Sequence, residues 1–219
     1  MRRVLDIVCA TAGLVLLFPI FAVIGLAIKF EDGGPVSYRH RRVGKSFRKF
    51  GLLKFRSMVP HAEKIGGPVT VSGDPRVTRV GRFLRRYKLD ELPQLINVLN
   101  GDMSLVGARP EVERYVEMFR SHYAVILRDR PGITDPATLA FRHEEEMLRS
   151  SDVEEQYVFE ILPRKLELSL EYSRQRNFLS DLKIIVRTLL GICWTPRESK
   201  GFRGIEDRRT EALVRLTRD

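Results

Sequence analysis

Two adjacent carboxylic acids, Asp90 and Glu91, stand among basic residues in the middle of the chain. Arg85, Arg86 and Lys88 precede them, and Asp102 and Arg109 follow. Carboxylates are ligands that Mg²⁺ prefers, and guanidinium groups bind phosphate. The spacing therefore indicates a site where a divalent cation and a phosphate share space.

The same pair has a purely structural interpretation. Asp is a favoured N-cap residue, and acidic side chains are stabilised at the positive end of a helix. A helix is predicted from near Asp90 through ELPQLINVLN to the terminating Gly101, with Pro93 tolerable in its first turn. The turn-like stretch after it, GDMSLVGARP, can place a rigid Arg109 beside the acids. Capping and chemistry both remain open on spacing alone.

The elements before the acid pair can be predicted from apolar spacing. VSYRHRRV and SFRKFGLLKF, on either side of Val43-Gly44-Lys45, predict a short basic β-hairpin, which we place at the lipid headgroups. The turn-rich segment from Gly66 to Pro75 is a candidate loop over a site. Residues Val77 to Lys88 have helical spacing with arginines on the surface.

The elements after the pair are mostly helical. EVERYVEMFRSHYAVILRD predicts one helix, ended by Pro131-Gly132. The acidic run His143 to Glu146 is typical of solvated helix surface without chemistry. A last helix near Leu179 to Trp194, with Ser180 as its N-cap, has a wide apolar face. It lies either on the membrane or in the protein core.

Composition limits the class of protein. The chain has 219 residues, 43% of them hydrophobic, which predicts a single compact unit. Its 38 Lys and Arg outnumber 28 Asp and Glu, and the net charge of +10 implies an anionic partner. Cys9 and Cys193 lie in apolar stretches without a metal-binding pattern, which excludes a zinc module and a disulfide scaffold.

The N-terminal segment is predicted to enter a bilayer. It runs from Val4 to Ile28 with Asp6 as its only charged residue, whereas a spanning helix needs about 20 apolar residues. A signal peptide has a shorter apolar region followed by a small-residue cleavage site, and no such site follows Ile28.

Both flanks of this segment are basic, so both ends favour the cytoplasmic face. Arg2 and Arg3 precede it, and Lys29 begins a longer series of basic residues after it. Pro19 removes a backbone donor near the middle. This pattern predicts a re-entrant helix, break and helix that dips into one leaflet, with a kinked span as the open alternative.

Three motifs extend these observations. KFRSM (Lys54 to Met58), VTRVGRFLRRYKLDELPQLINVLNGDMSLVGARP (Val77 to Pro110) and RPGITDPA (Arg130 to Ala137) follow the apolar segment in this order. Together they closely resemble the bacterial sugar transferases, the monotopic polyprenyl-phosphate phosphoglycosyl transferases that begin surface polysaccharide and glycoconjugate assembly. The resemblance covers nearly the whole chain to about Trp194. Without the extra spans of longer members, the chain looks like the small form.

The resemblance implies specific roles. Asp90 would be the nucleophile and Glu91 the other half of a dyad, with Mg²⁺ bound by both. Arg56 would lie near the active site, and Arg109 would engage phosphate. Pro19 would make the re-entrant break.

The sequence departs from the family pattern at three positions. Ala108 stands where the family often has Pro, and Ser57 where it often has Thr. Ser169 stands where many members have an acidic residue, so either Glu167 or Glu171 substitutes or that role is absent.

Two further residues near the GITD turn, Asp135 and Arg142, are candidate contacts of the nucleotide sugar, with surface salt bridges as the alternative. The identity of the sugar cannot be read, because its contacts would come from loops such as Ile65 to Asp74.

We therefore expect a mostly helical α+β monotopic membrane protein with interfacial amphipathic helices. Residues 1–34 form the re-entrant helix and turn, and residues 35–195 form a catalytic domain on the cytoplasmic face of a bacterial inner membrane. Residues 196–219 form a charged tail or dimer contact, so a homodimer is left open.

The expected reaction transfers a sugar-phosphate from a UDP-sugar to polyprenyl phosphate and releases UMP through a covalent intermediate on Asp90. The alternative is a non-catalytic basic scaffold on the phospholipid membrane that binds anionic lipid or a protein partner. Nucleic acid is not expected, because no aromatic-interleaved RNA motif is present and the basic residues begin at a membrane segment.

Overall fold

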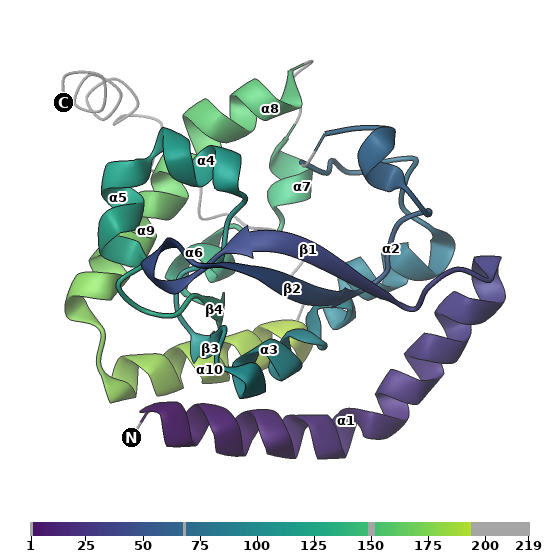
Figure 1. Ribbon diagram of the computed structural model, residues 1–219, viewed down its shortest axis with the longest axis horizontal. Helices are drawn as coiled ribbons and strands as arrows, with labels where there is room; N and C mark the ends of the chain where they lie inside the picture. The colour runs from purple at the N-terminus through teal and green to yellow at the C-terminus, as the bar shows by residue number, and fades with distance from the viewer. Residues whose placement is uncertain (1, 68, 149–151, 194–219) are drawn as a thin grey trace.

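The computed structural model describes residues 2–67, 69–148 and 152–193, with side chains to residue 191 (Figure 1). Its elements are α1 (Arg2–Asp32), β1 (Ser37–Val43), β2 (Lys49–Phe55), α2 (Arg79–Arg86), α3 (Gln94–Asn100), β3 (Ser104–Val106), α4 (Glu113–Met118), α5 (Arg120–Ile126), β4 (Gly132–Thr134), α6 (Pro136–Ala140), α7 (Glu144–Met147), α8 (Val153–Gln156), α9 (Leu162–Gln175) and α10 (Phe178–Cys193). The predicted mostly helical α+β class is confirmed.

Two small sheets stabilise the middle of the molecule. The predicted hairpin is confirmed, since β1 and β2 pair antiparallel from Ser37 opposite Phe55 to Val43 opposite Lys49. Strands β3 and β4 pair parallel, and their backbones approach so closely that a Cβ added at Gly132 would overlap the backbone of Gly107. This contact holds the segment leading to Arg109 against the GITD turn.

Helix α1 continues through Pro19 as one element, so the predicted break is not present as an interruption of the helix. A proline inside a helix removes one hydrogen bond and kinks the axis, and Figure 1 shows α1 bent partway along its length. The helix is long and apolar enough to cross a membrane, and only 11% of its most apolar window is buried.

Polar contacts fasten the N-terminal end of α1 to the rest of the molecule. The Arg2 Nε atom lies 3.3 Å from the carboxylate of Asp181 in α10. Arg3 donates to two carbonyl groups at the end of α3 at 2.5 and 2.9 Å. The buried carboxylate of Asp6 accepts hydrogen bonds from the Ser104 hydroxyl and, at 2.9 Å, from the Leu105 amide.

The C-terminal end of α1 is fastened to the same domain. Asp32 forms a two-armed ion pair with Arg56, whose Nε atom also donates to the Pro35 carbonyl at 2.6 Å. Glu31 accepts from the first backbone amides of α2 at 2.8 and 3.2 Å. Both ends of the apolar helix therefore rest on one globular body.

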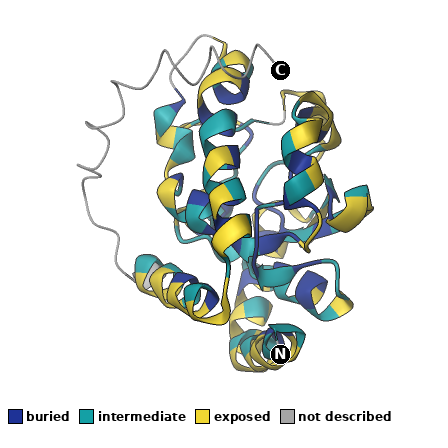
Figure 2. Cartoon of the chain, turned by 90° about the vertical axis from the view of Figure 1, so that its left-hand side faces the viewer, coloured by how far each residue is buried: buried dark blue, intermediate teal, exposed yellow. Residues whose placement is uncertain are grey.

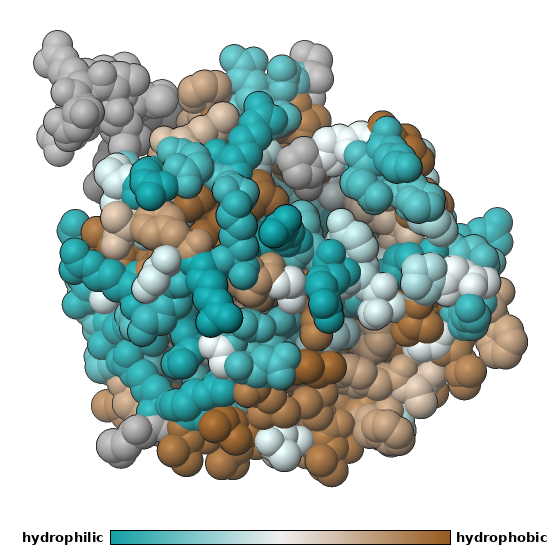
Figure 3. Space-filling view, in the orientation of Figure 1, coloured by the Kyte–Doolittle hydropathy of each residue, from teal (hydrophilic) through white to brown (hydrophobic). Residues whose placement is uncertain are grey.

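An apolar surface follows α1 and α10, which lie along the same side of the molecule (Figures 1 and 2). Figure 3 shows hydrophobic side chains gathered along that edge. On α10 the exposed large apolar residues are Phe178, Leu179, Leu182, Val186, Leu189 and Leu190. This exposure favours the membrane-surface interpretation of α10 over a core helix.

Two local predictions were wrong. The single helix expected after Pro110 is two helices, α4 and α5, which meet at the non-helical Phe119. The N-terminal cap of α10 is Asn177, whose side chain accepts from the Ser180 amide at 2.9 Å, while the Ser180 hydroxyl accepts from the Asn177 amide. Trp194 and the predicted segment 196–219 lie outside the described residues.

Candidate active site

A cavity of about 1150 Å³ lies between the hairpin, α2, α7 and the helices α1, α3 and α10. Toward α1, α3 and α10 its lining is apolar, with Cys9, Gly13, Leu17, Leu95, Ile185 and Leu189. Toward β1, α2 and α7 the lining is polar and charged. The cavity therefore has an apolar end beside α1, α3 and α10 and a polar end beside β1, α2 and α7.

Asp90 and Glu91 stand on a short 3₁₀ turn, Leu89–Glu91, between α2 and α3. Lys88 precedes this turn with a φ of 57°, a left-handed conformation that redirects the chain after α2. Helix α3 begins at Gln94, and neither acid caps it. The capping interpretation of the pair is therefore wrong, and the turn presents both carboxylates to the cavity.

Asp90 is buried, with only 4% of its surface exposed. Its Oδ2 atom lies 3.9 Å from the Lys54 ammonium, and its Oδ1 atom has no hydrogen-bond partner. Burial raises the pKa of Asp90, and the neighbouring Glu91 charge adds to this, although Lys54 opposes it. A buried carboxylate oxygen without a partner is costly, so it marks a place where a ligand is expected.

Glu91 has the opposite environment. Arg109 donates to both of its oxygens, to Oε2 at 2.9 Å, and Lys54 donates to Oε1 at 3.2 Å. Burial alone would raise the pKa of Glu91, but the charges of Arg109 and Lys54 outweigh it and hold that pKa well below its usual range. Glu91 is thus held ionised and in one orientation, whereas the carboxylate of Asp90 is held by fewer contacts.

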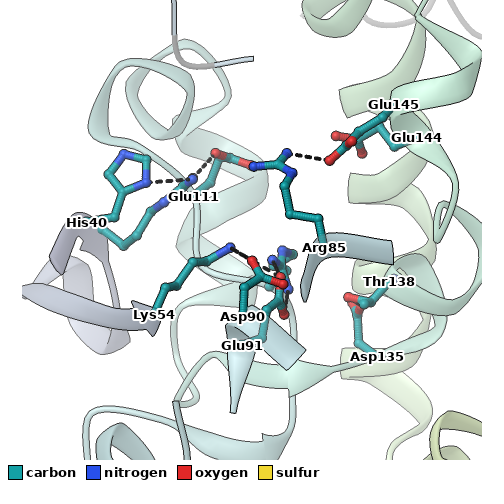
Figure 4. Close-up of polar contacts among 12 residues, drawn as sticks. His40, Lys54, Arg85, Asp90, Glu91, Glu111, Asp135, Thr138, Glu144 and Glu145 are labelled. Atoms are coloured by element: carbon teal, nitrogen blue, oxygen red, sulfur yellow. Dashed lines mark hydrogen bonds and ion pairs between the residues drawn. The ribbon is translucent and has the colours of Figure 1, made fainter. Parts of the chain in front are cut away.

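Figure 4 shows Lys54 from β2 pointing toward the acid pair, whereas the guanidinium of Arg85 from α2 points toward Glu145. Burial lowers the pKa of Lys54, while Glu91 and Asp90 oppose that shift. The sequence reasoning did not single out Lys54 as a site residue. The available signal was its place in KFRSM, directly before the strand end that faces the acids.

The acidic run around α7 also contributes to the cavity. Arg85 forms an ion pair with Glu145, and the Lys165 ammonium lies 2.7 Å from Glu144. The amide of Ser72 donates to the Glu145 carbonyl at 3.1 Å, which ties the predicted loop to α7. The expectation of a solvated surface was wrong for Glu144 and Glu145, because both are partly buried and line the cavity.

A second polar network lines the same cavity. Glu111 pairs with Arg42 and accepts from the Tyr157 hydroxyl at 2.8 Å. Burial would raise the pKa of Glu111, but Arg42 and Lys165 lower it overall. Burial also lowers the pKa of His40 to about 4, and the Arg42 charge acts in the same direction.

The structure brings together some of the predicted residues and separates others. Arg109 lies with the acid pair. Arg56 lines the cavity, but its guanidinium is engaged by Asp32 at the end of α1. Asp135 is fully buried as the N-cap of α6, accepting from the Thr138 amide at 2.7 Å. Asp135 thus supports neither a sugar contact nor a surface salt bridge.

The structure also places Ser169, where the sequence departs from the family pattern, and the candidate contact Arg142. Ser169 is buried and donates to Asp135 at 2.7 Å. Glu167 and Glu171 are exposed, so neither substitutes for an acidic residue at Ser169. Arg142 lines the cavity, and its Nη2 atom is buried without a hydrogen-bond partner.

The carboxylates of the site offer few free oxygens to a divalent cation. Within the described residues, no group of three or more Asp, Glu, His or Cys side chains is placed to hold a metal ion. Mg²⁺ is often bound through one or two carboxylates together with substrate phosphates and water. The unpartnered Oδ1 atom of Asp90 suits this mode, whereas the oxygens of Glu91 are already shared with Arg109 and Lys54.

Comparison with known proteins shows the family to which the chain belongs. The bacterial sugar transferase family model matches residues 1–195. The exopolysaccharide production protein ExoY of Rhizobium meliloti (strain 1021) is 33% identical over 207 residues, covering 88% of this chain and 85% of that protein.

Longer relatives match through the same region. The UDP-glucose:undecaprenyl-phosphate glucose-1-phosphate transferase of Escherichia coli (strain K12) is 39% identical over 194 residues, covering 86% of this chain and 39% of the relative. A UDP-N-acetylgalactosamine-undecaprenyl-phosphate N-acetylgalactosaminephosphotransferase of Aeromonas hydrophila is 34% identical over 191 residues, or 86% of this chain and 42% of the relative. The chain belongs to the bacterial sugar transferase family.

Proposed function

We propose that this chain is a phosphoglycosyl transferase that moves a sugar-phosphate from a UDP-sugar to a polyprenyl phosphate. The observation that carries the proposal is the buried Asp90, with one free carboxylate oxygen, in a cavity ringed by cations and continuous with an apolar end. Relatives named as UDP-sugar:undecaprenyl-phosphate transferases support the same substrates.

In the first step, an oxygen of the ionised Asp90 attacks the phosphorus of the UDP-sugar that carries the sugar. The bond from that phosphorus to the bridging oxygen breaks, and UMP leaves with the bridging oxygen and its electron pair. Arg85 and Lys54 stabilise the negative charge on the transferred group and on UMP. The product of this step is a sugar-phosphate covalently held by Asp90.

In the second step, a phosphate oxygen of the polyprenyl phosphate attacks the same phosphorus. The bond to Asp90 breaks, and the carboxylate returns to its starting form with the new diphosphate formed on the lipid. Glu91 keeps Arg109 in place through both steps, because its two oxygens hold the guanidinium in a fixed orientation.

Asp90 would hold Mg²⁺ beside the substrate phosphates, while the oxygens of Glu91 stay engaged by Arg109 and Lys54. When bound, this ion would neutralise diphosphate charge and favour departure of UMP. Loss of turnover on addition of a chelator, restored by excess Mg²⁺, is the expected outcome.

The membrane arrangement follows from the two ends of α1. Because Arg3 and Asp32 contact the same domain, we infer a re-entrant α1 with Arg2 and the catalytic domain both on the cytoplasmic face. A cysteine at position 2, in a background with Cys9 and Cys193 replaced by Ser, should resist a membrane-impermeant maleimide in intact cells. Labelling from the periplasmic side would contradict this topology.

The competing proposal is a non-catalytic scaffold that binds anionic lipid through its basic surface. The two are separated by incubating the full chain in membranes with polyprenyl phosphate, Mg²⁺ and a panel of UDP-sugars. The transferase releases UMP from at least one donor and forms a lipid-linked sugar diphosphate. A scaffold releases no UMP from any of them, while still binding the membranes.

A further inference from the structure

Arg142 and Lys88 differ from most other arginines and lysines of the cavity, because neither has an ion pair among the described residues. Of these two, Arg142 also has a buried guanidinium nitrogen for which the described residues offer no hydrogen-bond acceptor. Arg42, Lys54, Arg85, Arg109 and Lys165 each have a carboxylate partner. Among the described residues, none accepts a hydrogen bond from the buried Nη2 atom of Arg142, and no ion pair engages its guanidinium.

The position of Arg142 also differs. It follows α6 and faces α10, where a Cβ added at Gly191 would overlap its Nη1 atom. The cavity lining on this side comes from Ile185, Thr188 and Leu189 of α10. Val186, Leu189 and Leu190 of α10 are exposed and apolar. Arg142 is therefore the cation at the membrane side of the cavity.

Arg142 is partly buried, and a buried guanidinium nitrogen without an acceptor is energetically unfavourable. Burial also lowers the pKa of Arg142. An anion from outside the described residues would both accept a hydrogen bond from this nitrogen and pair with the guanidinium charge. The donor diphosphate has its cations at the acid pair, on the polar side. An anion that approaches Arg142 through the apolar lining must carry an apolar chain of its own.

We propose that Arg142 and the adjacent Gly191 form the acceptor subsite, where the phosphate of a membrane-held prenyl phosphate binds to the guanidinium. This assignment rests on the proposed function and moves Arg142 from the nucleotide-sugar side to the lipid side. Gly191 contributes by leaving space for the guanidinium beside α10.

The assignment separates the two substrates in kinetics. Arg142→Gln should raise the KM for undecaprenyl phosphate about 10- to 100-fold, the value of a charge-assisted hydrogen bond to phosphate. Arg142→Gln should leave the KM for the UDP-sugar within about twofold of wild type, because only binding of the acceptor changes. The amount of UMP released without acceptor should also stay within about twofold. Gly191→Ala should change the acceptor KM in the same direction, because its methyl group displaces the guanidinium.

The matched control is Arg187→Gln, which removes an exposed cation from α10 without touching the cavity. It should leave the acceptor KM unchanged while weakening general attraction to anionic lipid.

Direct binding tests the subsite even if no transfer is found. The full-length protein in nanodiscs is titrated with undecaprenyl phosphate, undecaprenol, phosphatidylglycerol and inorganic phosphate. We expect Arg142→Gln to lose binding of undecaprenyl phosphate selectively, whereas Arg187→Gln retains it. Equal binding by wild type and both Arg142→Gln and Gly191→Ala would overturn the proposal, as would a raised donor KM with an unchanged acceptor KM. Preference of wild type for phosphatidylglycerol or inorganic phosphate over undecaprenyl phosphate would also overturn it.

Discussion

Asp90 and Asp135 are both buried carboxylates near the cavity, yet their surroundings are opposite. The oxygens of Asp135 accept from the Thr138 amide, the Thr138 hydroxyl and the Ser169 hydroxyl, each at 2.7 Å. Among the described residues, Asp90 forms one ion pair, with Lys54 at 3.9 Å, and its Oδ1 atom has no hydrogen-bond partner.

The difference separates structure from chemistry. A fully hydrogen-bonded carboxylate stabilises the fold and has no capacity left for a ligand. An incompletely bonded one costs stability and retains that capacity. Sequence placed both residues among site candidates, and hydrogen bonding distinguishes them.

Replacement of the unsatisfied acid should have the largest effect on activity. Asp90→Asn should lower turnover by roughly 1000-fold or more, because the amide cannot serve as the nucleophile. Its thermal midpoint should be unchanged or higher, since a buried charge is removed. Transfer assays and thermal unfolding on the same preparation test both statements. Turnover above about one tenth of wild type would contradict the nucleophile assignment.

Replacement of Asp135, the fully hydrogen-bonded acid, should lower stability more than activity. Asp135→Ala removes the α6 N-cap and leaves Ser169 unpartnered, so we expect a loss of about 2 to 4 kcal/mol in unfolding free energy. Ser169→Ala should cost about 1 kcal/mol. Activity per folded molecule should remain within about tenfold for both. A stable Asp135→Ala protein that is inactive would place Asp135 in the chemistry.

Two arginines extend the comparison. Arg109→Ala should reduce turnover about 10- to 100-fold, and Lys should restore little because it cannot donate in a two-armed geometry. Arg56→Ala should instead loosen the end of α1 by leaving Asp32 unpaired, which limited proteolysis of the membrane-bound protein can detect. Equal kinetic effects of the two changes would remove the distinction.

The raised pKa of Asp90 gives a pH test with the smallest expected effect. Attack requires the ionised carboxylate, so activity should fall as the pH drops through a value above the ordinary Asp pKa of about 3.9. Lys54→Gln should move this acid limb upward, because a charge that favours ionised Asp90 is lost. The exposed Lys49, paired with Glu113, provides the control. An unmoved limb in Lys54→Gln would show that another group titrates.

Much of the fold follows from local patterns in the sequence. Alternation around Val43-Gly44-Lys45 predicts the hairpin, and apolar spacing predicts α2 and α10. Predictions failed where tertiary contacts decide the outcome. Phe119 is non-helical and divides a strongly helical sequence, and the helical hydrogen bonding of α1 continues past Pro19.

The site was predictable only in part. The DELPQL and GDMSLVG motifs identified the acid pair and Arg109. Lys54, Glu111 and Glu145 come from segments whose sequence gives no sign that they converge, because the convergence depends on packing of α7 and the hairpin around α2. The sequence marks Asp135 as a candidate ligand in the same way as Asp90. Only the fold shows that the carboxylate of Asp135 is fully hydrogen-bonded within the protein.

The most direct test of the central claim is mass spectrometry of the Asp90 peptide after incubation with a UDP-sugar and Mg²⁺ without acceptor. We predict an added mass of one sugar-phosphate on that peptide, released UMP in equal amount, and neither in Asp90→Asn. Adding polyprenyl phosphate should then remove the adduct and yield the lipid product. UMP release only when both substrates are present, with no adduct at any time, would contradict the covalent mechanism.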